Sequence, residues 1–537
     1  MVERICRIYL KHQNLFHYFF LILIIATGAV FRLYNLQSNP IALNQDEAIN
    51  GYDAYSIANT GRDHHGAWQP QPMLESFGDW TSPLITYITV PFVKIFGLNV
   101  WSVRLPVAIL GTISIYLFYI LAMQLFESKK LALFGAFIWA ISPWAISLSR
   151  WAIPPSIVPF FLLLFLVLLF DALKSNKSTL KTIRKFVLVG VAAGLLTYTY
   201  PTMKLFVPLF LGTICLLFLF FFRKKFKGLF IAGFTCLLFI APIFILTFSD
   251  PGKYNSRYSV TSLAASGENI FFGFILRYIE YFLPTFAFGY GDPNNMHKVP
   301  GFSSIPDFLS IFFYMGLFIV LYKLYKTREP YLFKKSHLAV ILTGLLFFPV
   351  AAALTKDHLM LLRTVHGFVF IIIFTLVGIK FIFEYIKSIK VKQLIAGIMF
   401  FLLIMNITAF SVYYFIFYPG FVKPNFNYGL KNTFEYVYLN KKYYDKIIID
   451  KDILQIYFLF YFQYDANLLH AKDREEKFNS YMDGKVEFRD ICKCDLEGAL
   501  KLYRVQDEER IWYSVYESNN SLYVVKDMQY KKARFQF

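Results

Sequence analysis

Long apolar runs separated by short polar segments fill most of this chain of 537 residues. A helix needs about 20 apolar residues to cross a hydrocarbon core of about 30 Å, and about eleven runs approach or reach that length. They lie near residues 15–33, 104–126, 131–149, 155–172, 184–200, 203–222, 228–248, 307–325, 338–354, 364–384 and 394–418. The pattern therefore predicts an α-helical polytopic membrane protein whose membrane part covers residues 1–418.

Two long polar segments interrupt these runs, at residues 35–103 and 249–306. Within the first, the stretch Pro83–Phe96 is apolar but short, and Pro91 breaks it. A run of that length is too short for a span, so we expect an interfacial helix there.

A second helix is expected earlier in the same segment, over Asp46–Thr60. Gly61 follows it at the position where a left-handed residue commonly ends a helix. Asn44 and Glu47 have the spacing of an N-cap and its capping-box partner. The sequence thus predicts where this helix begins and where it ends.

Residues 419–537 are more polar, and we expect them to form a small α/β domain. Leu430–Leu439 reads as a helix, whereas the apolar run Leu454–Tyr464 fits a helix or a strand equally well. Cys492 and Cys494 lie in this region, but their spacing is a weak signal for a metal or redox site. Strands are predicted at Lys446–Asp450, Val486–Arg489 and Leu522–Lys526.

Composition and charge fit a membrane protein. The chain is 57% hydrophobic, and 54 Lys and Arg against 35 Asp and Glu give a net charge of +19. In a soluble protein this excess would favour nucleic-acid binding. Here the basic residues gather in short loops at every second turn, which is the positive-inside pattern. We therefore expect no nucleic-acid partner, a cytoplasmic N-terminus with Leu15–Phe31 as an uncleaved signal anchor, and a C-terminal domain outside the plasma or inner membrane.

The first candidate site is the acidic pair Asp46-Glu47, a few residues beyond the first span. One interpretation is structural: Glu47 closes the capping box, and Asp46 favours the positive end of the helix dipole. The other is catalytic: one carboxylate acts as a general base toward a hydroxyl, and its neighbour raises its pKa. Spacing alone leaves both interpretations open.

Several cations lie near the predicted outer ends of spans: Arg104, Arg150, Lys204 and Arg363, with His358 close to the last. Each taken alone could pair with a carboxylate or extend toward the interface. As a group on one membrane face, they would suit an anionic phosphate at head-group level.

Asp79 lies between Gly78 and Trp80 and is either a turn residue or a second acid of the site. The chain has no phosphate-binding P-loop, no nucleotide fingerprint and no zinc-ligand spacing. A mechanism driven by ATP or by a sugar nucleotide is therefore not indicated.

The order of several short motifs resembles the bacterial and archaeal membrane glycosyltransferases of the GT-C class. The resemblance is strongest to relatives of the protein O-mannosyltransferases (glycosyltransferase family 39) and of the lipid A aminoarabinose transferase. It covers roughly residues 10–420 and rests on Pro40-x5-Asp46-Glu47, Gly51-Tyr52-x-Ala54, Thr60-Gly61-Arg62-Asp63-x-x-Gly66, Ser76-Phe77-Gly78-Asp79, Ser102-Val103-Arg104-Leu105-Pro106, Ser149-Arg150, and Tyr198-x-Tyr200 with Lys204.

The resemblance implies a GT-C fold and an inverting transfer from a polyprenyl-phosphate sugar on the outer face of the membrane. It implies that Asp46 deprotonates the acceptor hydroxyl and that Glu47 supports it or holds the acceptor. Asp79 would be a second acid on the acceptor side. No cofactor is expected, and a divalent metal is not indicated. Cations that would neutralise the departing phosphate are Arg150, Lys204 and Arg363, with Arg104 and His358 on the same face.

Departures from the protein mannosyltransferase pattern leave the acceptor open. That branch has a His-Pro-Pro type of stretch where this chain has Asp79–Leu84, and relatives often have Arg where this chain has Lys204. We therefore expect a glycan, a lipid or a protein as acceptor.

A transporter or flippase of lipid-linked glycans is the alternative function. Transporters commonly show paired repeats and broken helices at mid-membrane, whereas the polar cluster here lies on loops. A catalytically silent scaffold that binds glycan through residues 419–537 is a third interpretation, and the acid and cation set argues against it.

Overall fold

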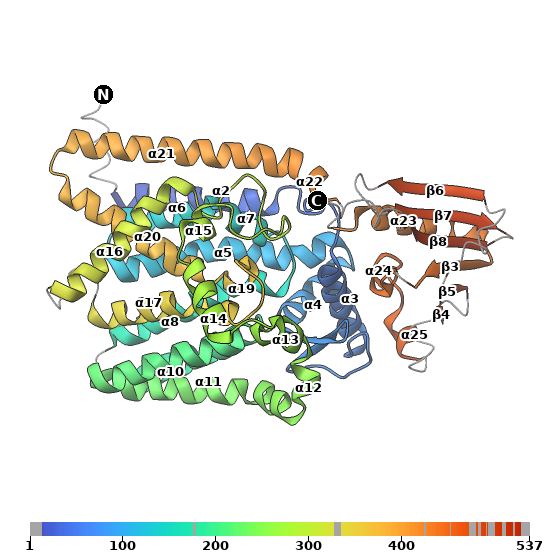
Figure 1. Ribbon diagram of the computed structural model, residues 1–537, viewed down its shortest axis with the longest axis horizontal. Coiled ribbons are helices and arrows are strands. Elements are labelled where there is room, and N and C mark those ends of the chain that lie inside the picture. The colour runs from blue at the N-terminus through green and yellow to red at the C-terminus, as the bar shows by residue number, and fades with distance from the viewer. Residues whose placement is uncertain are drawn as a thin grey trace.

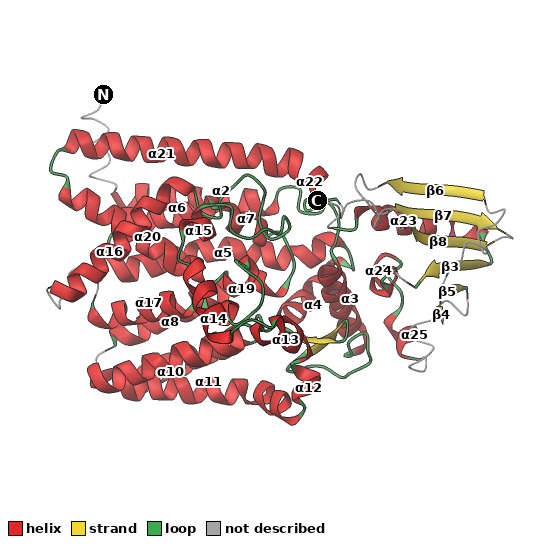
Figure 2. Cartoon of the chain, in the orientation of Figure 1, coloured by secondary structure: helices red, strands yellow, loops and turns green. Residues whose placement is uncertain are grey.

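The computed structural model is a bundle of roughly parallel and antiparallel helices with a sheet-containing domain beyond one end (Figures 1 and 2). It describes residues 13–175, 179–326, 334–423, 426–451, 453–471, 480–481, 485–489, 491, 500–506, 512–518 and 521–527. Cys492 and Cys494 lie outside the described residues.

Nine helices within these ranges are long and apolar enough to cross a membrane, which confirms a helical polytopic protein. Apolar side chains cover their outer surfaces and interlock inside the bundle, where α20 is buried along most of its length. The nine are built from α2 (Gln13–Leu33), α5 (Val100–Phe126), α8 (Val158–Lys174) with the 3₁₀ turn Pro154–Ile157, α10 (Met203–Phe221), α11 (Arg223–Ser249), α16 (Ser310–Lys326) with the 3₁₀ turn Asp307–Leu309, α17 (Lys335–Phe347) with α18 (Val350–Ala353), α20 (Gly367–Tyr385), and α21 (Ile389–Val412) with its continuation through the π-helical turn Tyr413–Phe417 to α22 (Tyr418–Phe421).

The expected count of about eleven spans is not confirmed. Residues of the predicted span 131–149 form α6 (Lys129–Ile141) and the short α7 (Pro143–Leu148). The break has a local cause, because a residue before proline avoids the helical region, and Ser142 is extended with ψ 128°. Residues of the predicted span 184–200 form α9 (Leu180–Thr197), whose first six residues include the basic residues Lys181, Arg184 and Lys185.

The two long polar segments fold at the end of the bundle nearest the sheet and along its side (Figure 1). The first forms α3 (Gln45–Thr60), a hairpin of β1 (Leu74–Ser76) and β2 (Asp79–Thr81), and α4 (Leu84–Phe96). The second forms α12 (Pro251–Tyr254), α13 (Ser256–Thr261), the 3₁₀ turn Leu263–Ser266, α14 (Ile270–Glu280) and α15 (Pro284–Phe288), and it lies beside α19 (Leu361–Thr364).

The C-terminal domain has the predicted α/β character. The sheet order is β4-β5-β3-β8-β7-β6, with β3 parallel to both of its neighbours and the other pairs antiparallel. The ambiguous run after residue 454 is a helix whose apolar side chains are buried. The elements are α23 (Tyr428–Asn440), the 3₁₀ turn Lys441–Tyr443, β3 (Lys446–Asp450), α24 (Gln455–Tyr461), α25 (Ala466–His470), β4 (Ser480–Tyr481), β5 (Val486–Arg489), β6 (Leu500–Gln506), β7 (Trp512–Ser518) and β8 (Ser521–Asp527).

The domain packs directly on α3. The Tyr52 hydroxyl donates a hydrogen bond to the Tyr464 carbonyl at 2.8 Å, and Ser56 Oγ lies 3.1 Å from His470 Nε2. Gly51 leaves room for Phe460, whose ring would lie 2.8 Å from a Cβ at that position. The helix that carries the acidic pair is therefore held between the bundle and the C-terminal domain.

Candidate active site

Helix α3 begins and ends as its sequence predicts. The Asn44 side chain accepts from the Glu47 amide at 2.9 Å, and the Glu47 carboxylate accepts from the Asn44 amide at 3.2 Å. Gly61 ends the helix with φ 72°. Asp46 and Glu47 therefore lie in the first turn, and because successive residues of a helix point about 100° apart, they face different surroundings.

Glu47 is fully buried and completely hydrogen-bonded. Arg104 donates to both carboxylate oxygens, at 2.7 and 2.9 Å, and the Ala152 amide donates at 3.1 Å. With the Asn44 amide, the carboxylate thus receives four hydrogen bonds, which is the full capacity of its two oxygens. This places Glu47 as the residue that fixes the start of α3 and leaves it no site for an acceptor.

Arg104 is also buried, and all five of its N–H groups are used. Besides Glu47, they bind the carbonyls of Leu36, Pro40 and Ala42 at 2.6–3.2 Å. A guanidinium group has five donors in all. No donor remains for a phosphate, which corrects the expectation that Arg104 binds one: it holds the first polar segment against the bundle.

Arg150, like Arg104, binds backbone carbonyl groups inside the protein. It is buried, it donates to the carbonyls of Phe31, Asn35 and Asn39 at 2.8–3.2 Å, and Phe415 covers its guanidinium group. These carbonyls belong to the end of α2 and the turn after it, where a cation complements the helix dipole. Arg150 therefore stabilises the exit of the first span, and its expected contact with a phosphate stays a prediction.

Asp46 has the opposite surroundings. It is half-buried, and within the part of the chain that the structure describes neither carboxylate oxygen has a hydrogen bond or an ion pair. Burial raises the pKa of this carboxyl, Arg257 opposes the shift and Glu47 adds to it. An acid with a raised pKa and free oxygens has the properties of a general base.

Tyr200 joins Asp46 to two arginines. Its hydroxyl is hydrogen-bonded to Arg363, and it lies within electrostatic range of Arg257 and Asp46. Arg363 Nη2 also pairs with Asp357 at 2.8 Å, and Nη1 donates to Thr355 Oγ1. The cluster Asp46–Tyr200–Arg257–Arg363 is therefore one acid and two cations around a tyrosine.

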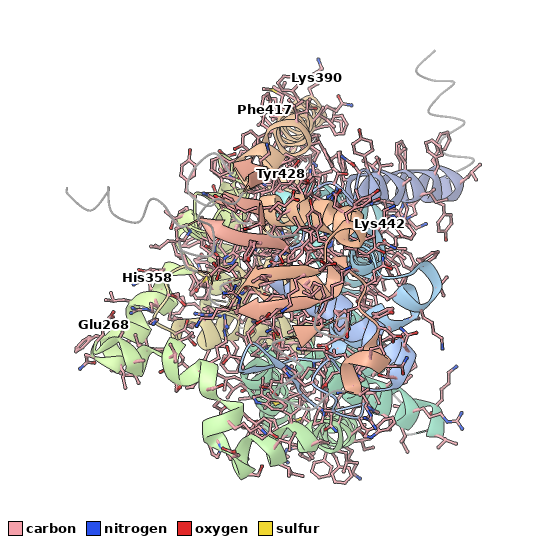
Figure 3. The ribbon with its side chains drawn as sticks, turned by 90° about the vertical axis from the view of Figure 1, so that its right-hand side faces the viewer. Glu268, His358, Lys390, Phe417, Tyr428 and Lys442 are labelled. Atoms are coloured by element: carbon pink, nitrogen blue, oxygen red, sulfur yellow. The ribbon has the colours of Figure 1, made fainter. Side chains whose placement is uncertain are left out.

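Lys204 lies one helical turn after Tyr200, in the first turn of α10. Its Nζ lies 3.6 Å from the Met73 sulfur, and no acidic partner is found for it among the described residues. His358, in contrast, is exposed at the edge of the molecule near Glu268 and pairs with Glu280 at 2.9 Å (Figure 3). The structure thus brings Arg363 to Tyr200 and places Lys204 beside Met73, while His358 already has an acidic partner.

Asp79 begins β2 and connects the two polar segments. It accepts from Arg257 Nη1 at 2.9 Å and from Ser256 Oγ at 3.1 Å, and Trp80 packs edge-on against Tyr254. Arg257 was not predicted from the sequence. The available signal was its positive charge in the long polar segment 249–306, where Lys and Arg are less frequent than in the short basic loops.

A second buried pair went unpredicted. His64 Nδ1 lies 2.6 Å from Asp53 Oδ1, and the His64 amide donates to the same oxygen at 2.9 Å. Burial disfavours charged imidazole, but Asp53 outweighs burial and raises the pKa of His64. This pair ties the turn after α3 to the helix. Among the described residues, no three His, Cys, Asp or Glu side chains group as metal ligands.

Comparisons with known proteins agree with this fold. The family model described as dolichyl-phosphate-mannose-protein mannosyltransferase matches residues 81–246, a region that includes Arg104, Arg150 and Lys204. YkcB of Bacillus subtilis strain 168, described as a mannosyltransferase, is 30% identical over 172 residues, or 32% of this chain and 23% of that protein. YycA of the same organism, with the same description, is 28% identical over 173 residues, or 32% and 24%. The matched part spans about a quarter of the length of these curated relatives.

Solved structures of ArnT from Cupriavidus metallidurans resemble the chain over most of its length. The apo structure has a TM-score of 0.53 at 12% identity, and the structure bound to undecaprenyl phosphate has 0.50 at 14%. Each match covers 82% of this chain and 84% of the other. The chain thus shares the fold of these ArnT structures.

Proposed function

We propose that this chain is a GT-C membrane glycosyltransferase that transfers a sugar from a polyprenyl-phosphate donor to a hydroxyl acceptor on the outer face of the membrane. The free carboxylate of Asp46 beside Tyr200, Arg257 and Arg363 carries this proposal. The family match to mannosyltransferases and the undecaprenyl phosphate in one ArnT structure support the donor class.

In the proposed reaction Asp46 is the general base. The acceptor oxygen attacks the anomeric carbon of the donor from the face opposite the phosphate, the bond from that carbon to the phosphate oxygen breaks, and the hydroxyl proton passes to Asp46. The anomeric centre is inverted, and polyprenyl phosphate leaves as an anion. A carboxylate with a raised pKa accepts a proton more readily than an ordinary carboxylate.

Lys204, Arg363 and Arg257 are the proposed partners of the leaving phosphate. Negative charge grows on that phosphate as the bond to the sugar breaks, so preorganised cations stabilise the transition state more than the ground state. Arg363 is held in place by Asp357 and Tyr200, and Lys204 has no competing acid in the described chain. These side chains supply the positive charge, so the proposed reaction needs no metal.

The test uses cells that lack the protein. Deletion of the gene is expected to cause a polyprenyl-phosphate sugar to accumulate in the membrane, and mass spectrometry of extracted lipids identifies its head group. Wild-type protein should remove the accumulated lipid, and the Asp46→Asn variant, made at equal abundance, should not. Absence of any accumulated lipid-linked sugar would overturn the donor class.

Transport is separated from transfer with purified protein in detergent, where no gradient exists. Release of polyprenyl phosphate from the donor under these conditions supports a transferase. A protein that only moves the intact donor across liposomes contradicts the proposal.

A further inference from the structure

Helix α14 carries an exposed apolar face, although it lies in a segment expected outside the membrane. Phe272 is 65% exposed and Leu276 is 62% exposed. Ile270, Phe271 and Ile279 are also exposed, whereas Gly273 and Arg277 on the other side of the helix are buried. An isolated exposed leucine is ordinary, but five large apolar residues on one short helix mark an interaction surface.

This apolar face continues the outer surface of a membrane span. The Tyr278 hydroxyl on α14 donates to the carbonyl of Leu346 on α17 at 2.7 Å. Leu346 is 50% exposed and belongs to the candidate span Lys335–Ala353. The apolar face of α14 therefore lies next to a surface that faces acyl chains, so the two surfaces share one environment.

The polar face of α14 is connected to the candidate site by hydrogen bonds. Arg277 pairs with Glu268 through two hydrogen bonds of 2.9 and 3.0 Å, and it donates to the Lys356 carbonyl at 3.1 Å. The Lys356 amide in turn donates to the Thr261 carbonyl at 2.9 Å. Thr355 and Asp357, on either side of Lys356, hold Arg363.

We propose that α14 lies in the membrane leaflet on the side of Asp46, with its apolar face among the acyl chains. Amphipathic helices with one apolar and one charged face take this position at membrane interfaces. The helix thereby anchors residues 355–357 at the depth of the lipid head groups, which is where a lipid-linked phosphate meets Arg363. The part concerning the donor rests on the proposed function, and the part concerning the bilayer does not.

The position of α14 is tested by spin labels in a cysteine-free full-length chain reconstituted in phosphatidylcholine vesicles. Leu276→Cys tests α14, and Leu439→Cys, on α23 and 72% exposed, is the matched control. A label at position 276 is expected to be relaxed strongly by oxygen and weakly by a water-soluble nickel chelate, with the reverse at position 439. Equal nickel access at the two positions overturns the proposal. Protection of position 276 from both reagents, with spin–spin broadening, overturns it in favour of a second copy of the chain.

The coupling to the donor is tested with two donors that share a head group and differ in chain length. Phe272→Asp with Leu276→Asp is expected to raise KM about tenfold or more for the long-chain donor, because the weakened anchor disturbs the lipid-facing approach, and to leave KM for a short, water-soluble donor unchanged. Leu439→Asp should alter neither value. An equal rise for both donors, or no rise for either, contradicts the coupling. If wild-type protein transfers sugar from neither donor, the proposed function fails while the spin-label result still decides the position of α14.

Discussion

Glu47 and Asp46 are adjacent in the chain, yet they lie in opposite surroundings. Glu47 accepts four hydrogen bonds and pairs with a buried arginine, whereas Asp46 is half-buried without a partner in the described structure. A buried charge that is fully paired fixes geometry, because removing one partner exposes the other to a large desolvation penalty. A partly buried charge without a partner is available to a ligand. The comparison separates the residue that builds the site from the residue that we expect to react.

Asp46→Asn gives the largest expected loss of activity. Removing a general base lowers the rate about 10²–10⁴-fold, and a carboxamide keeps the size of the side chain. Circular dichroism and the melting temperature should remain at wild-type values or better. A variant with full transfer activity would falsify the assignment of the base.

Glu47→Gln should mainly reduce stability. Breaking a buried ion pair costs about 3–5 kcal/mol, since Arg104 keeps its charge and loses its counter-charge. The melting temperature in detergent measures the loss, and donor binding should weaken only in proportion to the unfolded fraction. Glu435→Gln removes an exposed pair with Lys431 and serves as the control. If the two variants melt alike, Glu47 is not the anchor of α3.

Arg363→Gln should weaken donor use by about 10–100-fold, corresponding to the loss of charge-assisted hydrogen bonds of about 1.5–3 kcal/mol. Arg363→Lys should recover part of the loss, because it keeps the charge without the planar fork. Steady-state kinetics at varied donor concentration separate KM from kcat. Lys442→Gln, on the C-terminal domain, should leave both unchanged.

The pH dependence of activity should show the raised pKa of Asp46. The native protein binds a proton on Asp46 more tightly than the unfolded chain does. The contribution of this carboxyl to the free energy of unfolding is therefore present in acid and is lost as pH rises through the native pKa. Asp46→Asn should therefore gain stability relative to wild type as the pH rises above about 4. The acidic limb of the kcat/KM profile should lie above 3.8, the ordinary value for Asp. An acidic limb at or below 3.8 contradicts the raised pKa of Asp46.

Asp79→Asn should have the smallest effect. The Arg257 side chain that it binds is largely exposed, and exposed ion pairs contribute about 0–1 kcal/mol. We expect less than about a fivefold change in kcat/KM and no change in melting temperature. A loss as large as that of Asp46→Asn would assign Asp79 to the chemistry.

Local signals predicted much of the fold. Asn44, Glu47 and Gly61 located both ends of α3, because caps are decided by neighbouring residues. The apolar runs predicted a membrane bundle, and the strands predicted at Lys446–Asp450 and Val486–Arg489 match β3 and β5. The run after residue 454 was ambiguous because a short buried helix and a short buried strand share the same apolar pattern.

Pairing across long distances in the chain could not be predicted. Arg104 is 57 residues from Glu47, and Arg150 binds carbonyls more than 110 residues away. Sequence placed both near the site but could not show that every donor of Arg104 is already used. Arg257 was missed for the same reason, since its relation to Asp79 and Asp46 exists only after the two polar segments fold together.

The contact between Tyr52 and Tyr464 has a consequence for biosynthesis. The two residues are 412 positions apart, so α3 leaves the ribosome long before the segment that covers it. Synthesis proceeds from the N-terminus, and we infer that the helix bearing Asp46 stays uncovered until α24 and α25 have been synthesised. Thiol labelling of Ser56→Cys in a series of nascent chains should fall only once residue 470 has emerged, and an early fall would contradict this order.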